Sequence, residues 1–407
     1  MSNGQFIVGL DVGTTKICVI VGQYLNERMD VVAVGSAPSM GLRKGIVVNI
    51  ESTMESIRNA TKDAERASGI EINSVYVGIA GGHIKGFASY GAVGIKGGEV
   101  SSDDIERALD AAKAVYVPLD REVLHVIPLE YVVDGEEGIM NPVGMSGVRL
   151  ESRVQIVTGS VSAVQNLIRC CERANVQVND IVLEPLASSL STLTDDEKAQ
   201  GVVLVDVGGG TTDIALYKNG VLTHTSVIAV GGNHITNDIA IGLRLPVHEA
   251  ERVKMEYGTA IMNGTGSDKE IQIMVAGRDA RTIPRHYVTE IIAPRCEELF
   301  DLIKNELVSC GAYDEASYGL VITGGASQME GFSTLAEAVL GLPVRIGRPA
   351  NIDGLKNIID DPRYATGVGL LLYGAEHELS PIVYGDIFSN ILKKMKGWVK
   401  GFLKIRS

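Results

Sequence analysis

The sequence has few cysteines and no run of apolar residues long enough to span a bilayer. Its five cysteines, Cys18, Cys170, Cys171, Cys296 and Cys310, form an odd set without a Cys-x-x-Cys pair or a nearby group of histidines. This set argues against a disulfide framework or a zinc site and is typical of a reducing cytoplasm. The neighbours Cys170 and Cys171 are expected to be the core-facing and the flanking residue of one helix. The first residues have neither a basic start nor an apolar stretch, so we expect no signal peptide.

Basic residues are in deficit over most of the chain. The formal net charge of −13 argues against a general nucleic-acid binder, so we expect no nucleic-acid partner. Residues 387–407 are the exception, because they carry six lysines and arginines and no acid. The remaining chain therefore has a net charge of −19. A basic end on an acidic body indicates an attachment segment.

The apolar pattern predicts an α/β chain in which one unit occurs twice. Alternating residues over 6–39 predict three adjacent strands with tight turns, and a helix is expected over 50–68. Residues 201–232 repeat this opening plan. At 407 residues the chain is long enough for two or more domains with a sizeable core.

Two long segments interrupt the repeated units. The first, 82–157, contains a well-signalled helix over 101–115 and a strand over 122–133 that closes on the hairpin-type turn Asp134-Gly135. The second, 233–307, is expected to be mostly helical.

Two glycine- and threonine-rich turns each follow an apolar strand, in "DVGTTK" (11–16) and "DVGGGTTD" (206–213). Glycines let backbone N–H groups approach an anion, and threonine hydroxyls add further donors. Lys16 would place a positive charge against terminal phosphates, while Asp11 and Asp206 would hold the waters of a bound Mg²⁺. Either turn alone is an ordinary hairpin corner. The pair predicts a clamp that holds a phosphate chain from both sides.

Three further segments are compatible with a nucleotide site. "ITGGAS" (322–327) lies between a strand and a helix and could support an adenine. "EAERVK" (249–254) places Glu251 and Lys254 on one helix face, although an exposed salt bridge would give the same spacing. "VLEPLASS" (182–189) contains a Glu-Pro step, which is also an ordinary helix start.

Taken in order, these five segments resemble the actin-like ATPase superfamily, which includes actin, the heat-shock chaperone ATPase domain, sugar kinases and bacterial MreB. The resemblance implies two related α/β lobes with ATP and Mg²⁺ in the cleft between them. It also implies that Asp11 and Asp206 hold the metal through water and that Glu184 positions the attacking water. The residues implied to bind nucleotide are Gly13, Thr14, Thr15, Lys16, Gly208, Gly209, Gly210, Thr211, Thr212, Glu251, Lys254, Gly324, Gly325 and Ser327.

A narrower resemblance comes from the interrupting segments and the basic end. "GGHIKGF" (81–87), "NPVGMSGVRLE" (141–151) and "VGGNHITNDIA" (230–240) look like the FtsA family of bacterial cell-division proteins. In that family a small strand–helix–strand–strand domain replaces the usual actin subdomain IB at another place on the first lobe. The implied fold class is α/β: duplicated ribonuclease-H-like units in an actin-like two-lobe arrangement, with this inserted domain and a C-terminal amphipathic helix.

The resemblance divides the chain into subdomains. They are subdomain IA (1–81, 158–198 and 352–378), the inserted subdomain IC (82–157), subdomain IIA (199–229 and 308–351), subdomain IIB (230–307), a linker (379–386) and a membrane-targeting helix (387–407).

The family resemblance implies a structural role at the division site. Proteins of this family tether filaments of FtsZ, the Z ring, to the inner face of the cytoplasmic membrane. They also self-assemble and recruit later division proteins, here expected through subdomain IC. Such a chain needs ATP for assembly and is at most a slow ATPase. The alternatives are a pilus-assembly relative and an actin-fold small-molecule kinase, neither of which needs a basic amphipathic end.

A group of arginines in the second interrupting segment suits a short acidic peptide. Arg278, Arg281, Arg285 and Arg295 form a basic cluster on an otherwise acidic body. Of these, Arg281, Arg285 and Arg295 are expected to bind the short acidic C-terminal tail of FtsZ. The alternative is that they pair with glutamates of their own helix, which are Glu290, Glu297 and Glu298.

The end of the chain has the pattern of a helix that lies on a membrane surface. Its lysines exclude a membrane span, and its all-cationic polar face and the chain's lone tryptophan favour anionic lipid over packing on the protein's own core. The residues expected to contact the membrane are Phe388, Ile391, Leu392, Met395, Trp398, Val399, Phe402 and Leu403 on the apolar side and Lys393, Lys396, Lys400 and Lys404 on the flanks.

Overall fold

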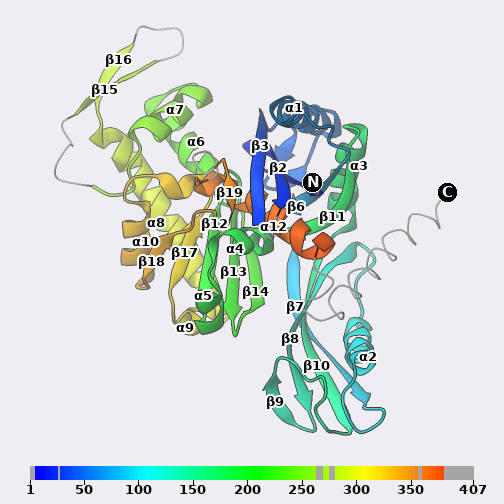
Figure 1. The fold of residues 1–407 in the computed structure, drawn as a ribbon. Helices are drawn as coiled ribbons and strands as arrows, with labels where there is room; N and C mark the ends of the chain where they lie inside the picture. The colour runs from blue at the N-terminus through cyan, green and yellow to red at the C-terminus, as the bar shows by residue number, and fades with distance from the viewer. Residues whose placement is uncertain are drawn as a thin grey trace.

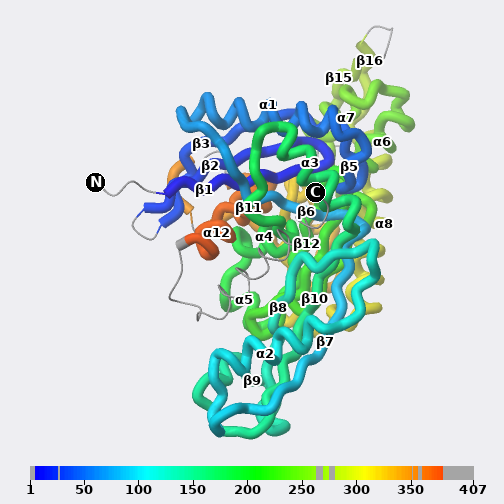
Figure 2. The backbone as a smooth tube through the Cα atoms, turned by 90° about the vertical axis from the view of Figure 1, so that its right-hand side faces the viewer, coloured from blue at the N-terminus to red at the C-terminus, as the bar shows by residue number. Residues whose placement is uncertain are grey.

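The computed structural model describes residues 5–25, 28–262, 269–274, 280–350, 352–355 and 360–379. Two α/β lobes lie side by side, and an elongated unit of strands with one helix extends from the first lobe (Figure 1). A view turned by 90° shows that this unit projects away from both lobes (Figure 2). The predicted two-lobe α/β fold with an inserted domain is therefore confirmed. The predicted C-terminal helix over 387–407 lies outside the described residues.

The first lobe is built on a six-stranded sheet in the order β11-β6-β1-β2-β3-β19. The first three strands form an antiparallel meander, and β6 runs parallel to β1. The strands are β1 (Gln5–Val12), β2 (Lys16–Leu25), β3 (Arg28–Pro38), β6 (Ser74–Ile79), β11 (Gln177–Leu183) and β19 (Asp353–Gly354).

Helices cover both faces of this sheet, which explains why β1 and β2 are apolar over most of their length. On one face, Val8 and Leu10 share a core with α1 (Ile50–Ser68), and on the other Ile7 shares a core with α12 (Ala365–Leu379). The predicted helix over 50–68 is confirmed. The first lobe also contains α3 (Val161–Arg173), α4 (Glu184–Thr192) and the short strands β4 (Leu42–Arg43) and β5 (Ile46–Val47).

The two adjacent cysteines correct one expectation. Cys170 and Cys171 in α3 are both fully buried, so the prediction that one of them would flank the helix was wrong. Helix α3 packs against α1 on one side and contacts β10 and β11 on another, and this leaves no solvent-facing position for either thiol.

The second lobe repeats the topology of the first. Its five-stranded sheet has the order β14-β13-β12-β17-β18, again with an antiparallel meander and a parallel neighbour of the first strand. The strands are β12 (Val202–Val207), β13 (Thr212–Lys218), β14 (Val221–Ile228), β17 (Leu320–Thr323) and β18 (Val344–Ile346). The predicted internal repeat is therefore present as a shared strand order.

Helices and one small hairpin complete the second lobe, as expected for a mostly helical second interruption. The helices are α5 (Asp195–Gln200), α6 (Gly232–Leu243), α7 (Val247–Tyr257), α8 (His286–Ser309), α9 (Ala312–Glu315) and α10 (Phe332–Leu340), with the hairpin β15 (Glu270–Ile273) and β16 (Arg281–Pro284) and the short turn η1 (Gly325–Gln328). A further short turn, η2 (Pro362–Tyr364), leads into α12. Within the described ranges, none of the helices has the length and apolar character needed to cross a bilayer.

The inserted domain is a four-stranded antiparallel sheet in the order β7-β10-β8-β9 with one helix packed on it. Its elements are β7 (Lys85–Gly94), α2 (Ser102–Lys113), β8 (Arg121–Val133), β9 (Glu136–Ile139) and β10 (Arg149–Ser160). Ser101 caps α2 through a reciprocal pair of hydrogen bonds with Asp104. The predicted turn is confirmed, because Asp134 and Gly135 both have positive φ angles, as a tight hairpin requires.

The close approach of α2 to β7 yields a test of the packing in the inserted domain. A Cβ atom on Gly91 would lie 2.1 Å from the carbonyl oxygen of Ala108 and 2.3 Å from the amide nitrogen of Ala112. Because helix backbone cannot yield as a side chain can, Gly91→Ala should lower the free energy of unfolding by about 1–3 kcal/mol. Urea unfolding followed by circular dichroism measures this loss. Gly94→Ala in the same strand is the control, since its nearest new contact is 3.9 Å away; equal losses would contradict the account.

Candidate functional site

The two glycine-rich turns occupy equivalent places in the two lobes. Each joins the first two strands of its sheet and contains four residues between the last paired ones. The last paired residues are Val12 and Ile17 in the first turn and Val207 and Thr212 in the second. When the two turns are aligned by these paired residues, Lys16 of the first turn corresponds to Thr211 of the second. The Thr-Thr pairs that make the two segments look alike in sequence are therefore not structurally equivalent.

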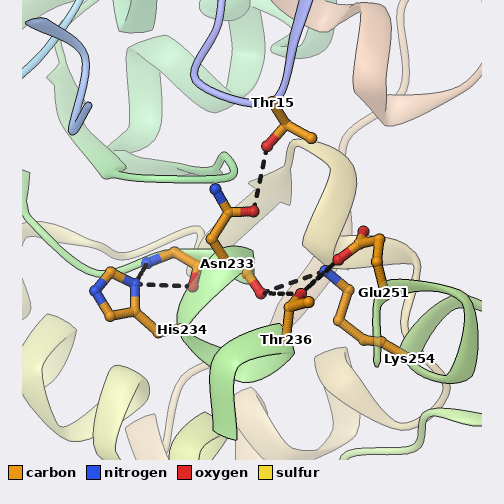
Figure 3. Close-up of polar contacts among 8 residues, drawn as sticks. Thr15, Asn233, His234, Thr236, Glu251 and Lys254 are labelled. Atoms are coloured by element: carbon orange, nitrogen blue, oxygen red, sulfur yellow. Dashed lines mark hydrogen bonds and ion pairs between the residues drawn. The ribbon is translucent and has the colours of Figure 1, made fainter. Parts of the chain in front are cut away.

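The two turns approach each other across the space between the lobes. The hydroxyl of Thr15 donates to the side-chain oxygen of Asn233 at 3.4 Å, at the start of α6 (Figure 3). A Cβ atom on Gly209 would lie only 1.9 Å from Oγ1 of Thr15, and one on Gly210 would lie 2.8 Å from Oγ1 of Thr14. A larger residue at either position would force the threonine of the opposite turn to move, so glycine favours the close approach of the turns.

A cavity of about 670 Å³ lies between the lobes and opens beside these turns. Its size falls in the range of small-molecule and cofactor sites. It brings together most of the residues predicted from sequence: Gly13, Thr14, Thr15, Lys16, Gly208, Gly209, Thr211, Glu251, Lys254, Gly324 and Gly325, with Asp11, Asp206 and Glu184.

Three predicted residues do not line the cavity. Gly210 is packed against Thr14, as described above. The hydroxyl of Thr212 donates to the carbonyl oxygen of Val230 at 2.8 Å, and that of Ser327 donates to the carbonyl oxygen of Gly324 at 2.7 Å. In this structure Gly210, Thr212 and Ser327 stabilise the conformation of their segments without lining the cavity.

Lys16 is held by the segment that leads into α12. Its ammonium group donates to the carbonyl oxygen of Arg363 at 3.2 Å and lies 3.7 Å from the centre of the Tyr364 ring. Both partners belong to or border η2, which lies some 350 residues further along the chain. The lysine of the first turn is therefore positioned by a contact that no local motif predicts.

Four carboxyl groups converge at the strand ends: Asp11, Glu184, Asp206 and Asp213. Burial, and secondarily the charge of Asp206, raises the pKa of Asp213 to about 8. Burial also raises the pKa of Asp11 to about 6, although Lys16 opposes the shift. The pKa of Glu184 is raised well above its usual value by burial and then by the three neighbouring acids.

The strand-end acids differ in how their oxygens are paired. Burial raises the pKa of Asp206, and the hydroxyls of Ser188, at 2.7 Å, and Thr366, at 3.3 Å, partly offset this by donating to it. In contrast, Oδ1 of Asp213 is buried and has no hydrogen-bond partner among the described residues. An orphaned oxygen among crowded carboxyl groups fits a hydrated divalent cation, which would favour their charged forms.

Glu251 and Lys254 form a partly buried pair rather than an exposed salt bridge. The Lys254 ammonium lies 2.7 Å from a carboxylate oxygen of Glu251, and its side chain is 12% exposed. The same ammonium donates to Thr236 Oγ1 at 2.9 Å and to the carbonyl oxygen of Gly232 at 3.3 Å (Figure 3). Thr236 in turn donates to Glu251. The network ties α7 to the first turn of α6, directly beside the second glycine-rich turn.

The three arginines predicted to bind an acidic tail have different surroundings, and Arg278 of the predicted cluster lies outside the described residues. Arg285 lines the cavity between the lobes and pairs with Glu330 at 2.6 Å. Arg295 pairs with Asp238 at 2.5 Å and also with Glu298, one of the helix partners expected from sequence. Arg281 is exposed on β16. The predicted membrane contacts between Phe388 and Lys404 lie outside the described residues.

Some cavity residues were not anticipated from sequence. Asp213 follows the second turn on β13, and Asn233 and Thr366 lie in the first turns of α6 and α12. Only Asp213 carried a local signal, since it ends "DVGGGTTD". The other two come from elements whose approach to the turns depends on tertiary structure.

Comparisons of this sequence with known proteins indicate a single family. The family description "Cell division protein FtsA" matches residues 203–369, and "SHS2 domain inserted in FTSA" matches residues 81–158. A curated cell division protein FtsA from Pseudomonas aeruginosa is 45% identical, over 98% of this chain and 99% of its own.

Solved structures share the fold at low identity. A PilM–PilN type IV pilus biogenesis complex matches with a TM-score of 0.67 and 17% identity, over 91% of this chain and 98% of that chain. MreB5 of Spiroplasma citri bound to ADP matches with a TM-score of 0.56 and 14% identity, over 91% and 96%. These likenesses support the predicted actin-like fold class.

The raised pKa of Asp213 predicts a pH-dependent gain in stability when its charge is removed. Because this pKa rises from 3.8 to about 8 on folding, the folded state binds the proton more tightly, and stability falls as pH rises through that window. The advantage of Asp213→Asn over wild type should therefore grow by more than about 1 kcal/mol between pH 5 and pH 8 without Mg²⁺. Urea unfolding at both pH values measures it. Asp110→Asn, at an exposed ion pair, is the control, and a pH-independent difference for Asp213→Asn would contradict the assignment.

Proposed function

The chain belongs to the FtsA family of cell division proteins, and we propose that it is an ATP-binding, actin-like scaffold that tethers FtsZ filaments to the inner face of the cytoplasmic membrane. The observation that carries this proposal is the cavity between the two equivalent glycine-rich turns. The basic amphipathic pattern of residues 387–407 supplies the membrane half of the proposal. The alternative of a pilus-assembly role has only a fold-level likeness in its support.

We propose that the cavity binds ATP with its phosphates between the two turns. Backbone N–H groups of residues 13–16 and 208–211 would contact the phosphates, and Lys16 would leave its carbonyl partner for them. Glu251 and Lys254 would contact the ribose, and Gly324 and Gly325 would lie under the adenine. Gly210, Thr212 and Ser327 would contribute through the shape of these segments. The MreB5 neighbour was solved with ADP, which is compatible with this placement.

The acids at the strand ends fit Mg²⁺ held through water. Asp11 and Asp206 would hold the hydration shell of the ion, which would supply charge neutralisation for the phosphates. Glu184 lines the same cavity and would orient a water molecule near the terminal phosphate. Any ATP turnover serves assembly in this proposal and is expected to be slow.

The FtsZ contact is proposed on the outer part of the second lobe. Among the predicted arginines, Arg281 is the exposed one, whereas Arg285 and Arg295 already pair with acids of this chain. An acidic FtsZ tail would bind at Arg281 directly and at the other two by exchanging carboxylate partners. Self-assembly into filaments and recruitment of later division proteins through subdomain IC complete the proposal.

Removal of the first-turn lysine tests the nucleotide half of this proposal. Lys16→Ala should weaken ATP binding at least about tenfold, because a charge-assisted contact contributes about 1.5–3 kcal/mol. Isothermal titration calorimetry with ATP and Mg²⁺ measures the change. Lys113→Ala, which removes a lysine of the inserted domain, is the control. Wild-type affinity in a folded Lys16→Ala protein would contradict the proposed site.

A charge in the apolar face of the C-terminal segment tests the membrane half. Trp398→Glu should release the protein, and with it FtsZ filaments, from vesicles that contain anionic lipid, because burial of the charge is costly. Co-sedimentation with vesicles measures this, and binding to FtsZ in solution should be unchanged. Lys404→Gln, which lowers the charge without altering the apolar face, is expected to weaken binding only slightly. Full vesicle binding by Trp398→Glu would mean that the attachment lies elsewhere.

A further inference from the structure

A second, very small cavity lies directly behind the large one. Its volume is about 10 Å³, which is the room that one water molecule needs. Residues of both cavities overlap, since Val12, Gly45, Ala80 and Glu184 line each of them. The two cavities therefore adjoin each other at these residues.

Within the described part of the chain, two side chains with ionisable groups line this small cavity, those of His83 and Glu184. The remaining lining consists of glycine, alanine and larger aliphatic residues. An apolar cavity of this size would stay dry, but one with polar groups can hold water if that water finds two or more partners. The imidazole and the carboxyl group are two such partners.

The imidazole of His83 has no hydrogen bond within the described part of the chain. Both ring nitrogens, Nδ1 and Nε2, are buried without a partner. Leaving a buried polar atom unpaired costs about 1–3 kcal/mol, so two such atoms on one ring need an explanation. Burial, and then the charge of Arg121, lowers the pKa of His83, and the neutral ring therefore offers one donor and one acceptor.

Glu184 and His83 are both held in place by their surroundings. Glu184 begins α4 and packs against β6, where a Cβ atom on Gly78 would lie 3.0 Å from its Cγ. The carbonyl oxygen of His83 accepts a hydrogen bond from Arg121 at 2.9 Å, and Arg121 also donates to Thr158 at 2.9 Å. The backbone of His83 is therefore tied to the base of the inserted domain, where β8 begins and β10 ends.

We propose that one water molecule in the small cavity joins the imidazole of His83 to the carboxyl group of Glu184, and that His83 is a positioning residue for Glu184. The water would give one of the two orphaned ring nitrogens a partner and restrict the orientation of the carboxyl group that faces the nucleotide cavity. The effect of this water on ATP turnover rests on the proposed ATP function. The presence of the water in the small cavity does not depend on that function.

The water site is tested by crystal structures of the full chain at a resolution that shows ordered water. The wild-type structure should show one water within hydrogen-bond distance of a His83 ring nitrogen and of a Glu184 oxygen. His83→Phe keeps a flat ring but has no polar atom, so its cavity should be dry. A dry cavity in the wild-type protein would overturn the proposal, whether or not ATP binds.

The positioning role is tested by phosphate release from ATP in the same variants. His83→Phe should lower the rate about tenfold without a change in ATP affinity, as is typical when an outer partner of a reacting group is lost. His83→Gln retains a donor and an acceptor and should restore most of the rate. His248→Phe, at an exposed histidine of α7, is the control. Equal rates for wild type and His83→Phe, or equal losses for the Phe and Gln variants, would overturn the positioning role.

If the wild-type chain binds ATP but releases no phosphate, the positioning role of His83 is overturned. The crystal structures alone then decide whether the water site exists. Absence of ATP binding would instead contradict the proposed function. The three readouts therefore separate failure of the water site, of the role of His83 and of the nucleotide site.

Discussion

The approach of the two glycine-rich turns is the constraint on which the rest of the site depends. Side chains on Gly209 or Gly210 would collide with Thr15 or Thr14 of the opposite lobe, so the lack of a Cβ atom at these positions allows the lobes to approach this closely. This contact brings the ends of two sheets together. It thereby places Asp11 and Asp206, which occupy corresponding positions before the turns, on the walls of one cavity.

Helices α4 and α12 join this centre to the rest of the molecule. Ser188 of α4 and Thr366 of α12 hydrogen-bond to Asp206 and to each other, at 3.0 Å between their oxygens. Farther along α12, Tyr373 donates to Asp180 at 3.1 Å and packs against His125 of the inserted domain. Helix α12 thus contacts Asp206 of the second lobe through Thr366 and His125 of the inserted domain through Tyr373.

Local patterns predicted the elements, but not the contacts between distant ones. Alternating apolar residues predicted the strands, and caps such as Ser101 marked the ends of helices. The two turns were predicted from their shared glycine- and threonine-rich sequence after an apolar strand. The strand register shows, however, that the Thr-Thr pairs occupy different positions in the two turns. The burial of Lys254 and the η2 contact of Lys16 depend on packing between segments far apart in sequence. No spacing rule reports such contacts, so an exposed salt bridge was a reasonable alternative for Lys254.

The central claim is that a nucleotide bridges the two turns. Amide hydrogen exchange, measured with and without ATP and Mg²⁺, tests it most directly because it reports on both turns in one experiment. The account predicts slower exchange in residues 13–16 and in residues 208–211 together, since backbone N–H groups of both turns would bind the same phosphate chain. Protection of one turn alone, or of neither at saturating ATP, would contradict it.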